Sequence, residues 1–157
     1  YVGMVAAIYL AKGSGSLKLR CSDSSVQPFL DYNFLCEEQD LLRLRESIHL
    51  CITVAESEAY KGLLAERVMP ASKDLKSDGK LDQWLKQNVR TSHHISGTCK
   101  MNPSTDDLAV VNQLGQVHGL SNLRVADASI MNDCVRANTN VPAMMIGERI
   151  SDLIKGH

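Results

Sequence analysis

The longest helical periodicity in the sequence lies in residues 37–56, and it limits how much of the chain can be sheet. Acidic residues fill its first turn, as the helix dipole favours. The apolar side chains spaced along one face are Leu41, Leu44, Ile48, Cys51 and Val54. This spacing predicts an amphipathic helix, and we expect it to pack on a sheet. His49 within it is interpreted as a surface or packed residue rather than a ligand.

A second, shorter periodic stretch covers residues 78–89. Asp78 opens it, and Asp82 is expected in the first turn, where the helix dipole favours a carboxylate. The stretch predicts a short helix that leads into the polar segment 92–101.

The third periodic stretch, residues 141–155, has strong signals at both ends. Asn140 is a natural cap, Pro142 suits the first turn and Gly156 suits the stop. The apolar side of this predicted helix consists of Met144, Met145, Ile146, Ile150, Leu153 and Ile154. We interpret the two methionines as core residues.

Short runs of strand-forming residues lie between the helical stretches. Residues 2–11 and 17–21, separated by the turn formers of 13–16, predict a hairpin, and residues 27–35 predict extended chain. Three more short runs, at 109–111, 116–120 and 123–126, predict antiparallel edges or a return into a larger sheet. The fold class that follows is α+β.

Composition excludes several classes of protein. With 157 residues, 44% of them hydrophobic, the chain is long enough to bury a core. A net charge of -1 and a pI near 6.6 give no electrostatic reason to expect nucleic acid as a partner. The apolar run at 2–11 is too short to span a membrane.

The cysteines are odd in number, five, and contain no Cys-x-x-Cys pair. This pattern suits reduced thiols better than a disulfide framework or a zinc site, so we expect no metal and a cytoplasmic location. The chain begins with Tyr1 in a strand-like run, and we therefore expect it to be a fragment of a longer protein.

Segment 92–101, Ser-His-His-Ile-Ser-Gly-Thr-Cys-Lys-Met, has the densest polar chemistry of the chain. Loops of this kind often carry function. The pattern His-x-x-Gly-Thr-x-x-Met begins at His94. It resembles the catalytic-histidine segment of the glucose-methanol-choline (GMC) flavoprotein oxidoreductases.

Three other segments resemble the same family in the same order. Residues 15–35 contain a glycine turn, a strand, Ser-Asp at 22–23 and a Pro-x-x-x-x-Asn-Phe-Leu segment. Residues 117–131 resemble Val-x-Gly-x-x-x-Leu-Arg-Val-x-Asp-Ala-Ser, and residues 138–149 resemble the run into the last helix. Asn112 departs from the pattern, because the family often has an aspartate there, and this puts the local turn geometry in question.

The resemblance implies the C-terminal part of an FAD-dependent enzyme that oxidises an alcohol. Residues 1–105 would belong to an antiparallel-sheet substrate-binding domain with packed helices. Residues 106–157 would form the return into an FAD-binding α/β domain. The Gly-x-Gly-x-x-Gly turn that holds the FAD pyrophosphate in this family is absent. We therefore expect a missing N-terminal FAD-binding region as the partner of this chain.

By matching the family motif, His94 takes the position of the catalytic base. A histidine suits the chemistry, because removing a hydride from an alcohol carbon requires that the hydroxyl proton leave as well. Asn138 matches the family's second catalytic position, where an amide can orient the substrate oxygen. The alternatives are that the two histidines are ordinary loop residues and that the asparagines only cap the helix.

The resemblance also implies contacts with the flavin. The N-terminus of the last helix would offer N–H groups and a positive dipole end to the charge on reduced flavin. Asp127 and Ala128 match the segment beside the ribityl and phosphate groups, and the backbone of His93 would lie along the flavin edge. The complete set of expected cofactor-binding residues is His93, Asp127, Ala128, Asn140, Val141 and Pro142.

Two other functions stay open at this point. The GMC fold also includes hydroxynitrile lyases that retain FAD, although these tend to have histidine at the second position, where Asn138 stands here. Alternatively, the chain is an inactive truncated fragment without the nucleotide-binding half.

Overall fold

The computed structural model describes residues 2–156, which form two compact units. The first unit ends at Arg90 and the second begins at Thr91. This division precedes the 105/106 boundary predicted from the sequence, and the assignment of the two parts to domains of a larger enzyme stays a prediction. Helices and a two-stranded antiparallel sheet occur within the described residues, so the α+β class is confirmed.

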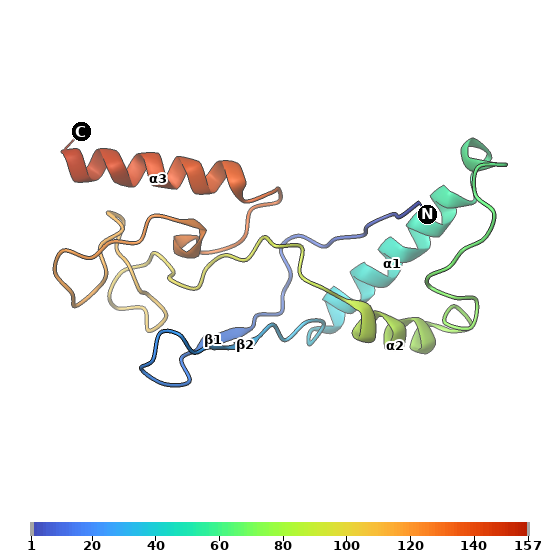
Figure 1. Ribbon diagram of the computed structural model, residues 1–157, viewed down its shortest axis with the longest axis horizontal. Helices are drawn as coiled ribbons and strands as arrows, with labels where there is room; N and C mark the ends of the chain where they lie inside the picture. Colours follow the sequence, from blue (N-terminus) through green and yellow to red (C-terminus); the bar gives the residue numbers. More distant parts are fainter. Residues whose placement is uncertain (1, 157) are drawn as a thin grey trace. The chain divides into compact units, whose positions relative to one another are not determined.

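The sheet pairs β1 (Ser16–Lys18) with β2 (Phe29–Asp31), and Leu17 lies opposite Leu30 (Figure 1). The prediction that residues 17–21 pair with residues 2–11 in a hairpin is therefore wrong. Residues 2–11 form no strand, and β1 pairs with the extended segment that follows it. Both strands are exposed on their two faces, so no buried face fixes their pairing from the sequence pattern.

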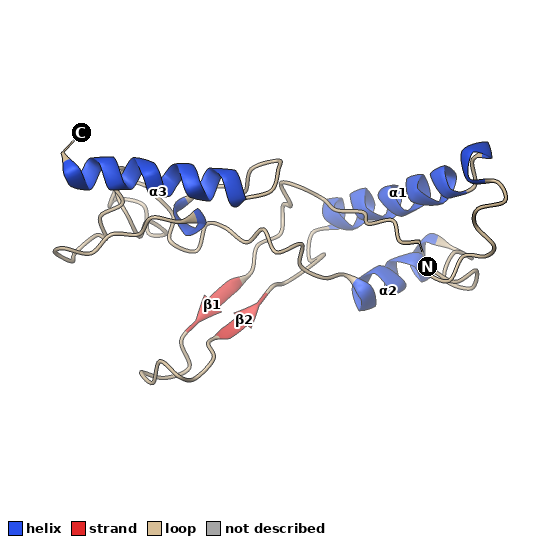
Figure 2. Ribbon diagram, turned by 45° about the horizontal axis from the view of Figure 1, so that its top comes forward, coloured by secondary structure: helices blue, strands red, loops and turns tan. Residues whose placement is uncertain are grey.

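The first core lies between α1 (Glu38–Ala55) and α2 (Asp78–Asn88), both close to their predicted bounds. Figure 2 shows the two helices side by side. The buried side chains they share are Leu41, Leu44, Leu81 and Leu85. Each fully buried leucine contributes about 1.5–3 kcal/mol. The long helix thus covers its apolar face with another helix and not with a sheet, contrary to expectation. His49 is exposed, as the structural interpretation required.

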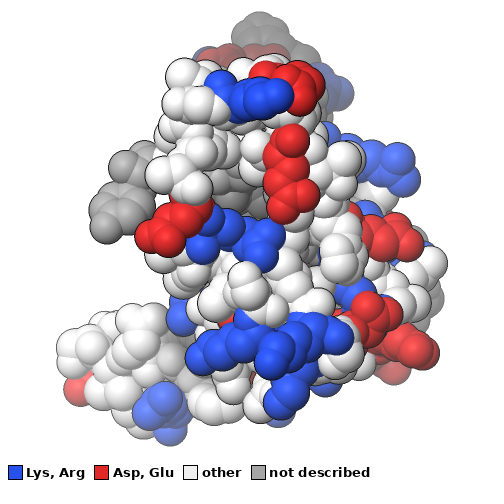
Figure 3. Space-filling model, turned by 90° about the vertical axis from the view of Figure 1, so that its right-hand side faces the viewer, with Lys and Arg blue, Asp and Glu red and all other residues white. Residues whose placement is uncertain are grey.

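An arginine joins these two helices at their edge. The Arg45 guanidinium donates to both carboxylate oxygens of Asp82, at 2.8 and 2.7 Å, and to Asp78 at 2.8 Å. The hydrogen bond with Asp82 is the main reason that the pKa of Arg45 is raised. Asp82 therefore forms an ion pair with a residue of α1. The sequence had suggested only an interaction of Asp82 with the dipole of α2, the helix that contains it. Figure 3 shows basic and acidic side chains on the same face of the molecule.

The first turns of α1 also hold the segment before β1. The carboxylate of Asp40, which is 2% exposed, accepts hydrogen bonds from the backbone N–H of Lys12 at 2.8 Å and of Gly13 at 2.9 Å. Arg43 donates to the carbonyl oxygens of Tyr9 at 2.7 Å and Leu10 at 3.2 Å. Side-chain hydrogen bonds thus satisfy part of the backbone between residues 9 and 13, where a strand would have used a sheet partner. The short helix η1 (Glu58–Tyr60) follows α1.

The second unit packs short loops on α3 (Asn140–Lys155) and η2 (Ala128–Ile130). Its buried side chains are Val111, Ile130, Ile146 and Ile150. The three β runs predicted in 109–126 are present only as single bridges, Val111 with Met101 and Val117, and Gln116 with Arg124. Tight turns between these bridges leave no room for longer strands.

The two ends of α3 can be compared with the capping and stop residues predicted from the sequence. Gly156 ends the helix with φ of 81°, and Pro142 lies in the first turn, as predicted. Asn140 is not the cap: it is the first helical residue, and Thr139 occupies the cap position. Met144 and Met145 are 56% and 62% exposed, so the expectation that they are core residues is wrong for this chain. Within residues 2–156, no helix has the length and apolar character needed to cross a membrane.

Candidate active site

The histidine loop is held to the Asp-Ala-Ser segment by main-chain hydrogen bonds. The N–H groups of Gly97, Cys99 and Met101 donate to the carbonyl oxygens of residues 128, 129 and 130, at 3.3, 2.8 and 3.0 Å respectively. Gly97 has φ of +78°, and an added Cβ would lie 3.1 Å from the carbonyl oxygen of Met131. The glycine of the His-x-x-Gly motif thus permits a close approach that another residue would resist.

The His94 side chain lies against the start of α3. Its Nδ1 is 3.3 Å from the hydroxyl oxygen of Thr139 and 3.5 Å from the Thr139 backbone nitrogen. The side chain is half-buried, and the carbonyl oxygen of the residue accepts a hydrogen bond from the Cys134 thiol at 3.3 Å. The imidazole and a helix N-terminus 45 residues away in sequence therefore meet at one place.

The residues around Thr139 are those that the sequence assigned to the site. Asn138 and Asn140 flank it and both are exposed. Val141 is exposed and Pro142 is half-buried in the first turn of α3. The expected base, the expected amide and the helix N-terminus are thus contiguous, and their individual roles remain predictions.

The other expected cofactor residues have local structural partners. Asp127 caps η2 by accepting hydrogen bonds from the Ser129 N–H at 2.8 Å and from its hydroxyl at 2.5 Å. The carbonyl of Ala128 accepts from Gly97, and His93 is an exposed residue with φ of +65°. The Asp127 carboxylate is exposed, so its capping role does not prevent a contact with a ligand.

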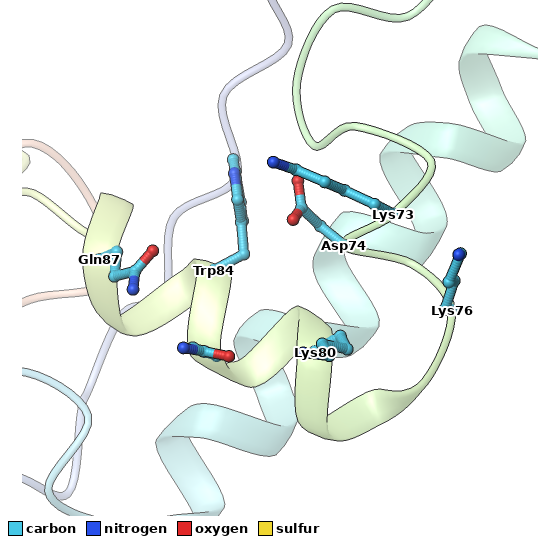
Figure 4. A pocket seen from close by; sticks show the side chains of 7 residues that line it. Lys73, Asp74, Lys76, Lys80, Trp84 and Gln87 are labelled. Atoms are coloured by element: carbon cyan, nitrogen blue, oxygen red, sulfur yellow. The ribbon is translucent and has the colours of Figure 1, made fainter.

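A shallow hollow of about 380 Å³ is present in the first unit, beside α2. Figure 4 shows Trp84 at its centre, with Lys73 and Asp74 next to it and Lys76 and Lys80 further out. The hollow contains none of the residues predicted for the site, and its Asp74 carboxylate accepts a hydrogen bond from the Ala71 N–H. Residues 2–156 contain no group of three or more potential metal-ligating His, Cys, Asp or Glu side chains.

Sequence reasoning missed two residues that contact His94. Thr139 was overlooked because it lies between two asparagines that drew the assignment, although a threonine just before a helix is itself a signal for a polar contact. Cys134 was treated only as one of several reduced thiols. All five cysteines are free.

Comparison with known proteins gives the class first. A relative that is 37% identical over 142 residues, or 90% of this chain, is the oxygen-dependent choline dehydrogenase of Pseudomonas syringae. This chain spans 24% of the length of that dehydrogenase. The chain is therefore similar to part of an oxidoreductase.

The family follows from a match to a family model over most of the chain. The sequence profile of the GMC oxidoreductases matches residues 11–147, and the chain belongs to this family. The resemblance to this family is thereby confirmed.

Solved structures agree with this assignment. A formate oxidase from Aspergillus oryzae, studied for the modification of its FAD, is 28% identical with a TM-score of 0.84, over 93% of this chain and 25% of that one. Pyridoxine 4-oxidase from Mesorbium loti is 26% identical with a TM-score of 0.80, over 91% of this chain and 27% of that one. The formate oxidase contains FAD, in agreement with the cofactor predicted from the sequence.

Proposed function

We propose that this chain supplies the histidine-bearing wall of an FAD-dependent oxidoreductase that oxidises the CH–OH group of an alcohol. The observation that carries the proposal is the contact between His94 and the residue that precedes α3, at 3.3 Å from Nδ1 to the Thr139 hydroxyl. The family membership and the similarity to a choline dehydrogenase support it. The five unpaired thiols agree with a reducing, cytoplasmic setting.

Oxidation of an alcohol to a carbonyl removes a hydride from carbon and a proton from oxygen. Bound FAD would supply the hydride acceptor. The proton needs a base that is neutral near working pH, and histidine is the side chain whose ordinary pKa meets this need. We assign this role to His94 Nε2, because Nδ1 is the ring nitrogen that faces Thr139.

The residues that would face the flavin fit an anionic group. α3 is 16 residues long, and its exposed first residues, Asn140 and Val141, offer backbone N–H groups at the positive end of the dipole. Such an end stabilises negative charge on a neighbouring group. Asp127, Ala128 and His93 would complete the wall, and the nucleotide-binding region missing from this sequence would hold the remainder of FAD.

The orienting amide is assigned to Asn138. Its exposed carboxamide can donate a hydrogen bond to the substrate oxygen and so fix the hydroxyl toward the base. Asn140 is the matched comparison, because it is also exposed and lies on the other side of Thr139.

The test is the rate of flavin reduction by alcohol in the full-length flavoprotein. His94→Ala is expected to slow reduction by about 10²–10⁴-fold, the usual contribution of a general base. Asn138→Ala is expected to cost about 1 kcal/mol, roughly fivefold. An unchanged rate in His94→Ala would remove the proposal, and a larger loss in Asn140→Ala than in Asn138→Ala would transfer the orienting role to Asn140.

The same preparation separates the two alternatives. Flavin that is bleached by an alcohol supports the redox function. Flavin that is bound but never reduced would indicate a lyase, and a protein that retains no flavin would indicate an inactive fragment.

A further inference from the structure

The hydroxyl of Thr139 has no role in capping the helix that it precedes. A threonine at the cap position ordinarily accepts a hydrogen bond from a backbone N–H in the first turn. Here Thr139 has helical backbone angles, φ of −79° and ψ of −4°, and its side chain makes no capping hydrogen bond. Its hydroxyl oxygen instead lies 3.3 Å from Nδ1 of His94.

Two groups of Thr139 compete for this ring nitrogen. The backbone N–H, at 3.5 Å, can only donate, so it favours the neutral ring that carries its proton on Nε2. The hydroxyl, which is closer, can donate or accept, so it is the only one of the two groups that can accept a hydrogen bond from a ring that carries its proton on Nδ1. Only the second tautomer leaves the lone pair of Nε2 free to take a proton from a substrate.

We propose that Thr139 is a positioning residue that holds His94 in its Nδ1–H tautomer and thereby makes Nε2 the base. The inference rests on the proposed function of His94. The bond also survives catalysis: when Nε2 takes the hydroxyl proton of the alcohol, the imidazolium has N–H groups at both nitrogens, and Nδ1–H continues to donate to the hydroxyl. The Cys134 thiol donates a hydrogen bond to the carbonyl oxygen of His94 and so helps to fix the main chain of His94.

Two variants at one position separate the hydroxyl from the shape of the side chain. Thr139→Val keeps a branched side chain but removes the acceptor, leaving only the backbone N–H to face Nδ1. The neutral ring then shifts its proton to Nε2, and we expect flavin reduction to slow roughly five- to tenfold with an unchanged KM, as for loss of one neutral hydrogen bond. Thr139→Ser restores the hydroxyl and is expected to restore the rate.

A spectroscopic measurement reads the tautomer without turnover. In the same flavoprotein labelled with ¹⁵N at histidine, without substrate, the ring of His94 is assigned by comparison with His94→Gln. We expect the neutral wild-type and Thr139→Ser rings to carry the proton on Nδ1, and the Thr139→Val ring to carry it on Nε2. A wild-type ring protonated on Nε2, or the same tautomer and rate in Thr139→Val as in wild type, would overturn the proposal.

The two proposals fail in different ways. If His94→Ala leaves flavin reduction unchanged, the assigned base is wrong, whatever the ring spectra of Thr139→Val give. If His94→Ala abolishes reduction while Thr139→Val and Thr139→Ser both match wild type in rate and tautomer, only the role of Thr139 is wrong.

Discussion

The buried carboxylate of Asp40 gives the sharpest test of how the first unit is held together. It accepts backbone hydrogen bonds from Lys12 and Gly13 at 2.8–3.0 Å, and only 2% of the residue is exposed. Hydrogen bonds to a charged group contribute about 1.5–3 kcal/mol each, and a buried donor left without a partner costs about 1–3 kcal/mol. Asp40→Asn keeps one acceptor oxygen, so we expect a loss of about 2–3 kcal/mol.

The control is Glu38→Gln, which removes the same charge from the same first turn of α1. Glu38 is exposed, so its loss affects only the interaction with the helix dipole, about 0.3–1 kcal/mol. Comparing the two variants cancels the dipole contribution and leaves the contribution of the hydrogen bonds to residues 12 and 13, together with that of the ion pair between Asp40 and Arg43 at 3.5 Å.

Trp84 provides the assay. It is the only tryptophan, and it packs against the leucine core between α1 and α2. Its fluorescence during urea unfolding therefore reports on the unit that contains Asp40. With a slope of about 1–2 kcal/mol per M, we expect the midpoint of Asp40→Asn to fall by roughly 1–3 M. A fall no larger than that of Glu38→Gln would refute the reasoning.

Two further predictions concern other parts of the chain. Gly115→Ala places a Cβ 2.8 Å from Ile150 Cδ1 at φ of +71°, so we expect a loss of about 2–4 kcal/mol in unfolding followed by circular dichroism. Gly119→Ala, at φ of +77° with open space around it, isolates the backbone strain, and an equal loss in both variants would contradict the packing argument. Ser25→Ala is expected to raise the pKa of Asp23 part of the way to its ordinary value, because the backbone N–H and then the hydroxyl of Ser25 lower it. The stabilisation from this lowered pKa is present above the ordinary value and is lost as the pH falls through the folded-state pKa, and an unchanged carboxyl titration by NMR would exclude the hydroxyl contribution.

The helices were predictable because their signals are local. The periodic apolar residues and terminal signals of 37–56, 78–89 and 141–155 all lie within the segments that form the helices, and each helix begins within one residue of its prediction. What covers a helix is a non-local property. The sequence could not indicate that the apolar face of α1 meets α2 rather than a sheet.

The strands were predicted less well for the same reason. A strand is stabilised by a neighbouring strand. The apolar run at 2–11 has the composition of a strand but has no neighbouring strand to pair with. The guanidinium of Arg43 instead donates to the carbonyl oxygens of Tyr9 and Leu10 at the end of this run, and the buried carboxylate of Asp40 accepts from the two residues that follow it. In the second unit, Asn112 stands where the family often has an aspartate, yet its Oδ1 still accepts from the N–H groups of Leu114 and Gln116. The turn is therefore retained with a neutral side chain.

The site was predictable only as far as motifs reach. The His-x-x-Gly-Thr pattern indicated His94, and the run into the last helix indicated the neighbourhood of Asn138. The contact that joins them is made by Thr139, which belongs to neither assignment. No local pattern predicts a bond across 45 residues, so such a positioning residue becomes visible only in the folded chain.

The folded chain fixes this loop from two directions, and that bears on its chemistry. Main-chain hydrogen bonds from Gly97, Cys99 and Met101 hold one side of the loop to η2. These bonds involve no side chain, so they do not depend on a side-chain charge or rotamer. The imidazole of His94 is held from the other side by Thr139 at the start of α3. A base must be placed to within a fraction of an ångström of the proton it accepts, and residues whose backbone and ring are both constrained meet this requirement better than a free loop. The histidine loop and the run into the last helix, distant in sequence, thus position the same imidazole. A substitution that disturbs either segment is expected to displace the ring nitrogens of His94.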